Sequence, residues 1–542
     1  MKALKHFFIH NYWLIIGIFI SLILVLVWFS SLDENQFLVM FSSDALYLPL
    51  IYQDIFENGN SIQGWTFNGA PNFVPDMLVF FILMKITSNF LTATFLFSII
   101  QYFSIITLFY FTYRKISTIS PAFFTFSIYL FSIFLLYFLV NKEFYYSFLL
   151  MSNSYHNGMF VMALITILLT INFFKNESWV TLVAIFFVSV IAVPCDRLFV
   201  FAYSAPLLCI LPVLLNAGYK KKNIFKLGIV CILAVLLGFL IFDKLSHNSI
   251  IDITRLNRPA TFEAMIDSWK MFSSQIIMFL SHATLLNLAT VLSILTLIWT
   301  VYYCVAEFVC IKRKKKEISV FFIFQLFVTF STLSIMLAPI VNGNYFGYDV
   351  IRYNYFFYII LLFNLVLLAN HCIRKQKYLV FGLNAFFSLG LTIYLIWNIM
   401  NMDFGQQLKN YFSFYPEHAR NLDALFDDDE ETCYGFTNDF WFGKHAAMFT
   451  RKNIRLYTGF DSGSPWLHAT NENWFFGGGN WKYSNPRFTF LVWRNDVKLP
   501  DFFVEQNPPY QSFEIDGVRT LYRVQPFVYE RGSFQPKLLV EN

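Results

Sequence analysis

Charged residues are scarce in this chain. Only 13% of its 542 residues are Asp, Glu, Lys or Arg, while 57% are hydrophobic, and the mean hydropathy is +0.54. A soluble protein of ordinary composition carries roughly 25% charged residues. The composition therefore excludes an ordinary soluble globular protein and indicates a polytopic membrane protein.

Cysteine is rare, and the common nucleotide-binding and hydrolase motifs are missing. The seven cysteines form no CxxC pair, so nothing in the sequence indicates a zinc or iron–sulfur site. Only Cys433 lies beyond Met400, which excludes a disulfide within the C-terminal region. No GxGxxG, Walker or GxSxG element stands out. None of the expected inner loops is long enough to fold into a nucleotide-binding domain, so cytosolic nucleotide chemistry is not supported.

Apolar runs of about 20 residues recur along the first 400 residues, and such a run crosses about 30 Å of hydrocarbon. They predict eleven membrane spans, at residues 11–30, 91–113, 121–140, 158–174, 179–194, 198–216, 224–242, 284–311, 318–340, 355–371 and 378–400. Residues 77–90 fit a re-entrant or interfacial helix, or half of a hairpin that turns at Lys85–Asn89. The expected fold is an all-α polytopic bundle of about 11–13 transmembrane helices, in which the first span is an anchor and not a cleaved signal peptide.

The distribution of Lys and Arg predicts the orientation of this bundle. With the N-terminus inside, the inner loops hold 17 Lys and Arg, and the outer loops before residue 401 hold 7 when the ambiguous segment 77–90 is left aside. Positive residues concentrate on the cytoplasmic side of membrane proteins. The N-terminus is therefore expected in the cytoplasm, and residues 31–76 and 401–542 on the other side of the membrane.

The composition changes after Met400. Residues 401–542 hold 14 Lys and Arg, 18 Asp and Glu and five Trp. The alternating runs Phe488–Trp493 and Val518–Val524 are typical of strands. We therefore expect two units, a bundle over residues 1–400 and a small exported α+β domain over residues 401–542. The acidic run Asp427–Glu431 resembles a metal site at first glance, but such a run is more often a solvated turn or helix end.

The loop behind the first span is acidic and contains no Lys or Arg over residues 31–76. Its carboxylates lie just outside the expected bilayer surface, where they suit chemistry on a substrate carried by a lipid. The six acidic residues are Asp33, Glu34, Asp44, Asp54, Glu57 and Asp76.

Within this loop, the segment Phe41–Tyr47 places Asp44 soon after the first span, with an aromatic residue close behind. The segment resembles the first external loop of GT-C membrane glycosyltransferases, although Ala45 stands where some families have Glu. The run Tyr434–Trp441, followed by Lys444, is similar to the C-terminal region of bacterial GT-C-like proteins, with Phe440 in place of Tyr. The resemblance covers the topology of residues 1–400, Asp44 and the exported tail.

This resemblance implies an inverting glycosyltransferase in a bacterial inner membrane. The enzyme would move a sugar from a polyprenyl (undecaprenyl) phosphate donor to a cell-envelope glycan or lipid acceptor, such as a lipopolysaccharide, on the periplasmic side. Membrane lipid would be a further partner, and no nucleic acid is expected. The resemblance implies no cofactor and the residues offer no convincing metal cage, although a divalent metal is left open.

Asp44 and Asp76 are the candidate catalytic carboxylates. The resemblance makes Asp44 the base that takes the proton of the acceptor hydroxyl, and Asp76 a supporting carboxylate or acceptor contact. Each also has a simpler interpretation as a helix cap: Asp44 would open a helix at residues 45–57, and Asp76 would head the next apolar segment. Asp54 and Glu57 are too far along that helix to share the site and are expected at the surface.

Arg197 and Arg352 are the candidates for binding the donor phosphate, because Arg grips phosphate through a bidentate fork. Arg258 and Asp196 are further substrate contacts in this hypothesis, and His156 would bind phosphate or a sugar hydroxyl. The alternatives are an ion pair for Asp196 and Arg197, snorkelling for Arg352 and a structural hydrogen bond for His156.

Two other functions compete with glycosyl transfer. A lipid-linked oligosaccharide flippase or other transporter predicts charges or breaks at mid-membrane and internal symmetry, whereas the charges here lie at span edges and no repeat is evident. An O-antigen polymerase or ligase predicts large outer loops rich in Arg, and the first loop has none.

Overall fold

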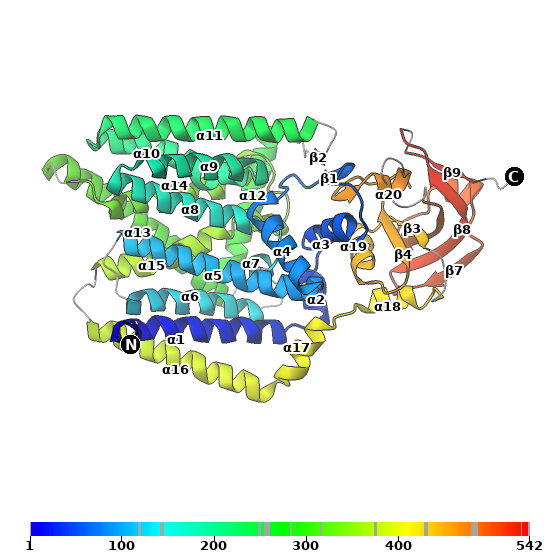
Figure 1. Ribbon diagram of the computed structural model, residues 1–542, viewed down its shortest axis with the longest axis horizontal. Helices are drawn as coiled ribbons and strands as arrows, with labels where there is room; N and C mark the ends of the chain where they lie inside the picture. The colour runs from blue at the N-terminus through cyan, green and yellow to red at the C-terminus, as the bar shows by residue number, and fades with distance from the viewer. Residues whose placement is uncertain are drawn as a thin grey trace.

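The computed structural model describes residues 2–116, 121–140, 146–247, 251–253, 261–281, 285–314, 317–372, 377–427, 432–477, 486–532 and 534–539. Arg258, Arg255 and residues 428–431 of the acidic run lie outside these ranges. Most of the described chain is helical, and the helices form a bundle with a smaller mixed lobe at one end (Figure 1).

Seven helices of the bundle are long and apolar enough to cross a membrane. They are α1 (Lys2–Ser30), α5 (Phe90–Ile116), α8 (Asn157–Asn176), α11 (Lys221–His247), α13 (Leu285–Lys314), α14 (Val320–Val341) and α16 (Lys377–Asn401). Four further apolar helices accompany them: α6 (Pro121–Val140), α9 (Trp179–Cys195), α10 (Ala205–Asn216) with the preceding turn η3 (Val200–Ser204), and α15 (Phe356–Cys372). Each of the eleven predicted spans coincides with one of these helices, so a mostly helical bundle with seven candidate membrane spans is confirmed. That all eleven helices cross a membrane stays a prediction.

The ambiguous segment after the first loop forms a short helix, α4 (Leu78–Thr87). Ten residues rise about 15 Å, roughly half of the hydrocarbon thickness. Ser88 adopts the left-handed region with φ of 51° and ends the helix, and α5 begins at Phe90. The segment is therefore half of a hairpin with α5, one of the forms expected from the sequence.

The remaining helices of the bundle half are short or lie between spans. They are α2 (Glu34–Met40), α3 (Tyr47–Tyr52), α7 (Tyr146–Met151), α12 (Phe262–Ser281) and the turns η1 (Gln53–Glu57), η2 (Phe73–Met77) and η4 (Tyr348–Tyr353). Asp33 begins α2 with a capping box, in which its side chain accepts from the backbone N–H of Gln36 and the Gln36 side chain accepts from Asp33 N–H. The first loop is thus a folded structure that covers the lobe end of the bundle.

Residues 404–539 form the C-terminal lobe, whose sheet has the strand order β4-β3-β6-β8-β7, with β9 also paired to β8. The strands β3, β4 and β6 are parallel, and the pairs of β8 are antiparallel. The elements are α17 (Phe404–Phe412), α18 (Glu417–Asp423), β3 (Cys433–Thr437), α19 (Phe440–Phe449), β4 (Ile454–Thr458), β5 (Thr470–Asn471), α20 (Asn473–Phe476), β6 (Phe488–Arg494), η5 (Phe502–Gln506), β7 (Gln511–Glu514), β8 (Arg519–Tyr529) and β9 (Pro536–Leu538). Both predicted strands fall on β6 and β8, as expected for a mixed α+β unit.

A second, three-stranded sheet joins the lobe to the bundle. Its order is β2-β1-β5, where β1 (Trp65–Phe67) belongs to the first loop and β2 (Ile251–Ile253) follows α11. Trp65 pairs with Ile251 in parallel and with Asn471 in antiparallel register. In Figure 1, α3 and α19 lie side by side between the bundle and the larger sheet, and these two helices are in contact. Backbone hydrogen bonds therefore hold the lobe against the first loop.

The two chain ends lie far apart. The N-terminal end of α1 is at the end of the bundle opposite the lobe, and the last described strand lies on the far side of the lobe (Figure 1). The side of the membrane on which each end lies stays a prediction.

Candidate functional site

Asp44 lies in the turn between α2 and α3, where it forms an ion pair with Arg352. The Arg352 Nη1 donates to Asp44 Oδ2 at 2.7 Å, across 308 residues of sequence. Both side chains are partly exposed, at 23% for Asp44 and 27% for Arg352. The N-cap residue of α3 is Leu46, and no side chain caps this end of the helix. The capping alternative for Asp44 is therefore wrong, because this carboxylate faces a guanidinium from the other half of the bundle.

Arg352 comes from the turn η4 and uses only part of its hydrogen-bonding fork. Its Nη2 lies 3.5 Å from the Tyr353 hydroxyl, and the guanidinium sits 5.3 Å from the centroid of the Tyr353 ring. The buried Nε–H has no hydrogen-bond partner among the residues that the structure describes. A buried donor without a partner is costly. This free edge of the fork is the geometry with which Arg meets a phosphate or carboxylate.

His156 and Asp196 form a dyad beside this pair. His156 Nδ1 lies 2.5 Å from Asp196 Oδ2, and Asp196 Oδ1 accepts from Leu198 N–H at 3.0 Å. Because a carboxylate oxygen only accepts, His156 Nδ1 carries the proton. The imidazole packs against the Tyr353 ring, with centroids 4.9 Å apart. Tyr353 thus bridges the His156–Asp196 dyad and the Asp44–Arg352 pair.

The backbone at His156 is in a rarely populated conformation. Its φ is +62°, in the left-handed region, and it forms the N-cap of α8 without a side-chain cap. Non-glycine residues in this region are uncommon and gather at functional sites. The preceding residue fixes the turn, because the Tyr155 hydroxyl is hydrogen-bonded to the Ser42 hydroxyl, two residues before Asp44. The turn that carries His156 is therefore tied directly to the turn that carries Asp44.

Asp76 lies behind this cluster, at the start of α8. Only 2% of it is exposed, and its carboxylate accepts a hydrogen bond from the backbone N–H of Gly158. Burial raises the pKa of Asp76 from 3.8 to about 7, the Gly158 hydrogen bond lowers it, and the Asp196 carboxylate raises it further. A Cβ atom on Gly158 would stand 2.4 Å from Asp76 Oδ1, so glycine is needed for this approach.

The segment around Asp76 is anchored on the end of α9. The backbone N–H of Asn72 donates to Cys195 O at 3.0 Å, and the N–H of Val74 donates to Cys195 Sγ at 3.3 Å. These bonds place Asp76 next to the loop that carries Asp196. Asp76 lies in the first turn of η2, which runs directly into α4, so it heads this apolar segment as the alternative predicted. Its carboxylate makes no cap there and is bonded instead to Gly158 of α8.

Arg197, a further cationic candidate, does not join the cluster. Arg197 follows Asp196 but is exposed, donates from Nη2 to Gly69 O at 3.2 Å and lies 4.7 Å from the Phe242 ring centroid. Arg258 lies outside the described residues. Of the predicted site residues, the structure therefore brings Asp44, Arg352, His156, Asp196 and Asp76 together and directs Arg197 elsewhere.

Asp54 is buried, which contradicts the expectation that it lies at the surface. It is 3% exposed and accepts four hydrogen bonds, from Asn60 Nδ2 at 2.9 Å, Trp65 Nε1 at 2.7 Å, Asn471 Nδ2 at 3.1 Å and Trp474 Nε1 at 3.0 Å. Burial raises its pKa, and these donors oppose the rise. Asp54 is thus a hub between the first loop and the C-terminal lobe. Glu57, one turn further on, is exposed as expected.

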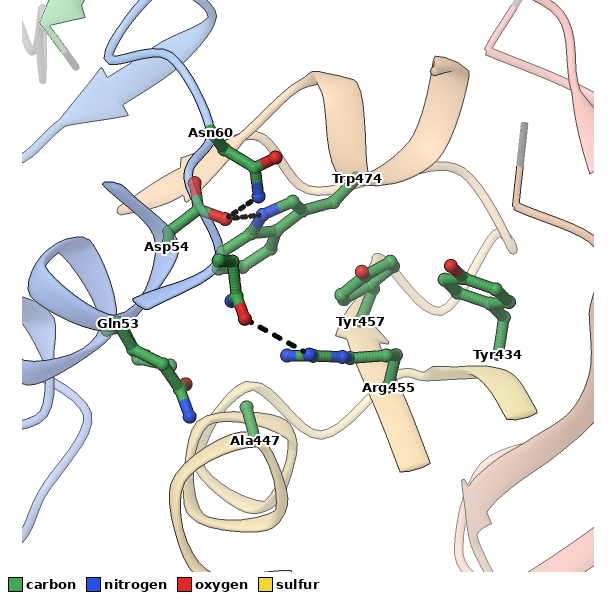
Figure 2. Close-up of a pocket in the computed structure, with 10 residues that line it drawn as sticks. Gln53, Asp54, Asn60, Tyr434, Ala447, Arg455, Tyr457 and Trp474 are labelled. Atoms are coloured by element: carbon green, nitrogen blue, oxygen red, sulfur yellow. Dashed lines mark hydrogen bonds between the residues drawn. The ribbon is translucent and has the colours of Figure 1, made fainter. Parts of the chain in front are cut away.

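Asp54 borders a cleft at the junction of the first loop with the lobe. Figure 2 shows its carboxylate facing Asn60 and the Trp474 indole, with Tyr457 and Arg455 on the lobe side. Arg455 donates to Asn58 Oδ1 at 3.4 Å across the junction. The cleft is lined by Leu50, Gln53, Asp54, Asn58, Asn60, Tyr434, Ala447, Arg455, Tyr457 and Trp474.

The lobe contributes residues that sequence reasoning missed. His468 is partly buried, and the charges of Asp44, Lys444 and Arg352 act on it; burial lowers its pKa. His445 is buried, and its Nε2 lies 2.6 Å from the carbonyl oxygen of Phe41, so it donates there. No local pattern marks these histidines, because Phe41 and Asp44 of the first loop lie about 400 positions earlier in the sequence.

In the described ranges, no group of three or more His, Cys, Asp or Glu side chains is placed to hold a metal ion. The cluster instead combines one ion pair, one His–Asp dyad and one buried carboxyl. Such a set can accept a proton, bind an anionic oxygen and hold an imidazole in one tautomer.

No protein-family model and no curated protein matches this chain.

Proposed function

We propose that this protein is a membrane glycosyltransferase of the GT-C type, which moves a sugar from a polyprenyl phosphate donor to an envelope glycan or lipid acceptor. The observation that carries the proposal is the convergence of Asp44, Arg352, His156 and Asp196 at the lobe end of an apolar helical bundle. A lipid-linked donor brings its phosphate to the bilayer surface, where such a cluster would meet it.

Arg352 is the phosphate contact in this mechanism. Its Nη1 is paired with Asp44, and its Nε is buried without a partner in the described part of the chain. A donor phosphate would use this Nε edge. Asp44 is held through Nη1, which does not belong to that edge, so Arg352 would hold the phosphate and the Asp44 carboxylate at the same time and set the leaving group beside the base.

Asp44 is the base. The acceptor oxygen forms a bond to the anomeric carbon of the sugar as its O–H proton passes to Asp44. The bond between the anomeric carbon and the phosphate oxygen breaks, and its electron pair leaves with the polyprenyl phosphate. Arg352 stabilises the negative charge on this leaving group. Attack from the face opposite the phosphate inverts the anomeric configuration.

His156 and Asp76 support this centre in different ways. With its Nδ1–H directed to Asp196, His156 presents Nε2 to a hydroxyl or phosphate oxygen, and the dyad fixes the ring orientation. Asp76 is too buried to touch the acceptor. It holds the first turn of α8, where His156 is the N-cap, and therefore acts as a positioning residue.

The test is complementation of a deletion strain, read by mass spectrometry of the envelope glycans. Deletion should remove one sugar, and the wild-type gene should restore it. Asp44→Asn keeps the side-chain size but cannot accept the proton, so transfer should fall on the order of 100-fold or more. Glu57→Gln, an exposed carboxyl change on the same loop, should restore the glycan fully. Full restoration by Asp44→Asn, or an unchanged glycan after deletion, would refute the proposal.

A further inference from the structure

The cleft between the first loop and the C-terminal lobe is lined by polar side chains from both parts of the chain. Gln53 and Asn60 belong to the first loop, and Tyr434 and Arg455 lie on the lobe side (Figure 2). The lining includes one cation, Arg455, and one carboxyl, Asp54. The cleft is therefore polar but balanced in charge, which favours a neutral polar ligand over an ion.

Asn60 is a lining residue whose hydrogen bonding is incomplete. It is only 5% exposed, and its Nδ2 donates to Asp54 Oδ1 at 2.9 Å. Its Oδ1 is buried and has no hydrogen-bond partner among the residues that the structure describes. An amide oxygen can only accept, and a buried acceptor without a partner costs free energy. The partner that Asn60 lacks is therefore an O–H or N–H group.

Gln53 and Arg455 supply further hydrogen-bonding groups to the cleft. Gln53 is partly exposed, and its side-chain amide forms no hydrogen bond within the described part of the chain. Arg455 Nη2 reaches Asn58 Oδ1 at 3.4 Å, which is long for a hydrogen bond, so a ligand oxygen can replace this contact at little cost. Gln53 offers both a donor and an acceptor, whereas Arg455 offers donors only.

Neighbouring hydroxyl groups match this set of partners. A hydroxyl both donates and accepts, so one can donate to Asn60 Oδ1 while the next accepts from Arg455. An anion can only accept, so it leaves Asn60 unpaired and stands beside the Asp54 carboxyl. Ligand sites use a few placed polar groups of this kind to fix orientation. Sugars carry such neighbouring hydroxyls at the rim of the ring, and a partly open cleft can take that rim.

The helix α3 connects this cleft to the candidate site. Asp44 lies before α3, and Gln53 follows its last residue, Tyr52. Nine residues at a rise of about 1.5 Å each separate the two by on the order of 10–15 Å. A sugar in the cleft is therefore not the one whose hydroxyl meets Asp44.

We propose that the cleft binds one sugar residue of the acceptor glycan through its hydroxyls, at a distance from the reacting hydroxyl. The identity of the ligand as the acceptor rests on the proposed function. The sugar-binding cleft itself rests on the lining groups, above all on the unpaired oxygen of Asn60 and the unengaged amide of Gln53.

The test measures binding of a fluorescently end-labelled oligosaccharide mixture, released by mild acid from the envelope of the source cells, to the purified full-length protein. Gln53→Ala removes hydrogen bonds to the ligand and none within the described protein, so it should weaken binding about threefold to tenfold and leave thermal unfolding unchanged. Ala447→Leu places a larger side chain in the cleft and should weaken binding at least tenfold. Gln511→Ala, at an exposed position elsewhere in the lobe, is the matched control and should bind as wild type.

Three results would overturn the proposal. The first is failure of the wild type to bind the mixture. The second is equal binding by Gln53→Ala, which would show that the cleft holds only water. The third is displacement of the bound oligosaccharide by excess inorganic phosphate at constant ionic strength, which would identify an anion site at Arg455. If Ala447→Leu does not fold, Gln53→Ala decides the question alone.

Kinetics separate failure of this inference from failure of the proposed function. In a transfer assay, Gln53→Ala should raise the KM for the acceptor and leave the KM for the donor unchanged. If transfer occurs and the acceptor KM does not change, the cleft is not part of the acceptor site, although the glycosyltransferase function stands. If the mixture binds through Gln53 but no donor is used, the sugar-binding cleft stands and the proposed function fails.

Discussion

Asp54→Asn should loosen the attachment of the C-terminal lobe to the first loop. Each carboxylate oxygen of Asp54 accepts two hydrogen bonds: Asn60 and Trp474 donate to Oδ1, and Trp65 and Asn471 donate to Oδ2. An Asn amide keeps one oxygen and replaces the other with an NH2 group. Two of the four hydrogen bonds are lost. The two side chains that donated them then face the NH2 group of Asn, which is itself a donor.

The expected loss in the free energy of unfolding follows from these contacts. A hydrogen bond to a charged group contributes about 1.5–3 kcal/mol, so two lost bonds cost about 3–6 kcal/mol. Burial of the carboxylate charge, which raises the pKa of Asp54, is relieved in the variant and offsets part of this cost. A net loss of about 2–4 kcal/mol lowers the melting temperature by roughly 5–15 °C for a unit the size of the lobe.

Tryptophan fluorescence reports on this loss of stability, because two of the four donors to Asp54 are the indoles of Trp65 and Trp474. Thermal unfolding of the detergent-purified protein, followed by this fluorescence, should show the early transition in Asp54→Asn. Glu57→Gln neutralises an exposed carboxylate three residues along the same turn and serves as the control, with an unchanged transition. A melting temperature of Asp54→Asn within about 1 °C of wild type would refute the assignment of Asp54 as the hub.

Three other predictions follow from charge and burial. Burial raises the pKa of Asp76 to about 7, so its contribution to stability is full below about pH 4 and is lost as the pH rises through 7. The melting temperature of Asp76→Asn relative to wild type should therefore be higher at pH 8 than at pH 5. An equal difference from wild type at both pH values would contradict this. Burial lowers the pKa of His445 to about 4, so its contribution is present above about pH 6.5 and is lost as the pH falls toward 4. His445→Gln keeps an N–H donor for Phe41 and should flatten this acid decline in a melting series, whereas an unchanged pH slope would argue against it. A reporter active only outside the cytoplasm, fused after Asn542, should be active; activity of a cytoplasmic reporter alone would reverse the orientation predicted from the Lys and Arg distribution.

The bundle was predictable because hydropathy acts locally. Each span needs about 20 apolar residues in succession, and this requirement is visible in the sequence without knowledge of its neighbours. The strands at β6 and β8 were equally visible as alternating runs. The order of the sheet and the short β2-β1-β5 sheet were not, because two- or three-residue strands carry almost no pattern and their partners lie hundreds of residues away.

The candidate site was predictable in its members but not in its pairings. Asp44, His156 and Arg352 stand out because charged or titratable groups at span edges are costly and often functional. That Asp44 pairs with Arg352, and His156 with Asp196, depends on how the helices pack. Asp54 was misjudged for the same reason. Helical spacing placed it away from Asp44, but its burial depends on Asn471 and Trp474 from the lobe, which the spacing does not show.

The Asp44–Arg352 pair also sets the geometry of the proposed reaction. Arg352 holds Asp44 through Nη1, and its Nε edge would take the donor phosphate, so one guanidinium would contact both the base and the leaving group. The acceptor hydroxyl would then meet the base at a fixed place beside the anomeric carbon. Because the β2-β1-β5 sheet holds the lobe against the first loop, this arrangement would not require the lobe to move.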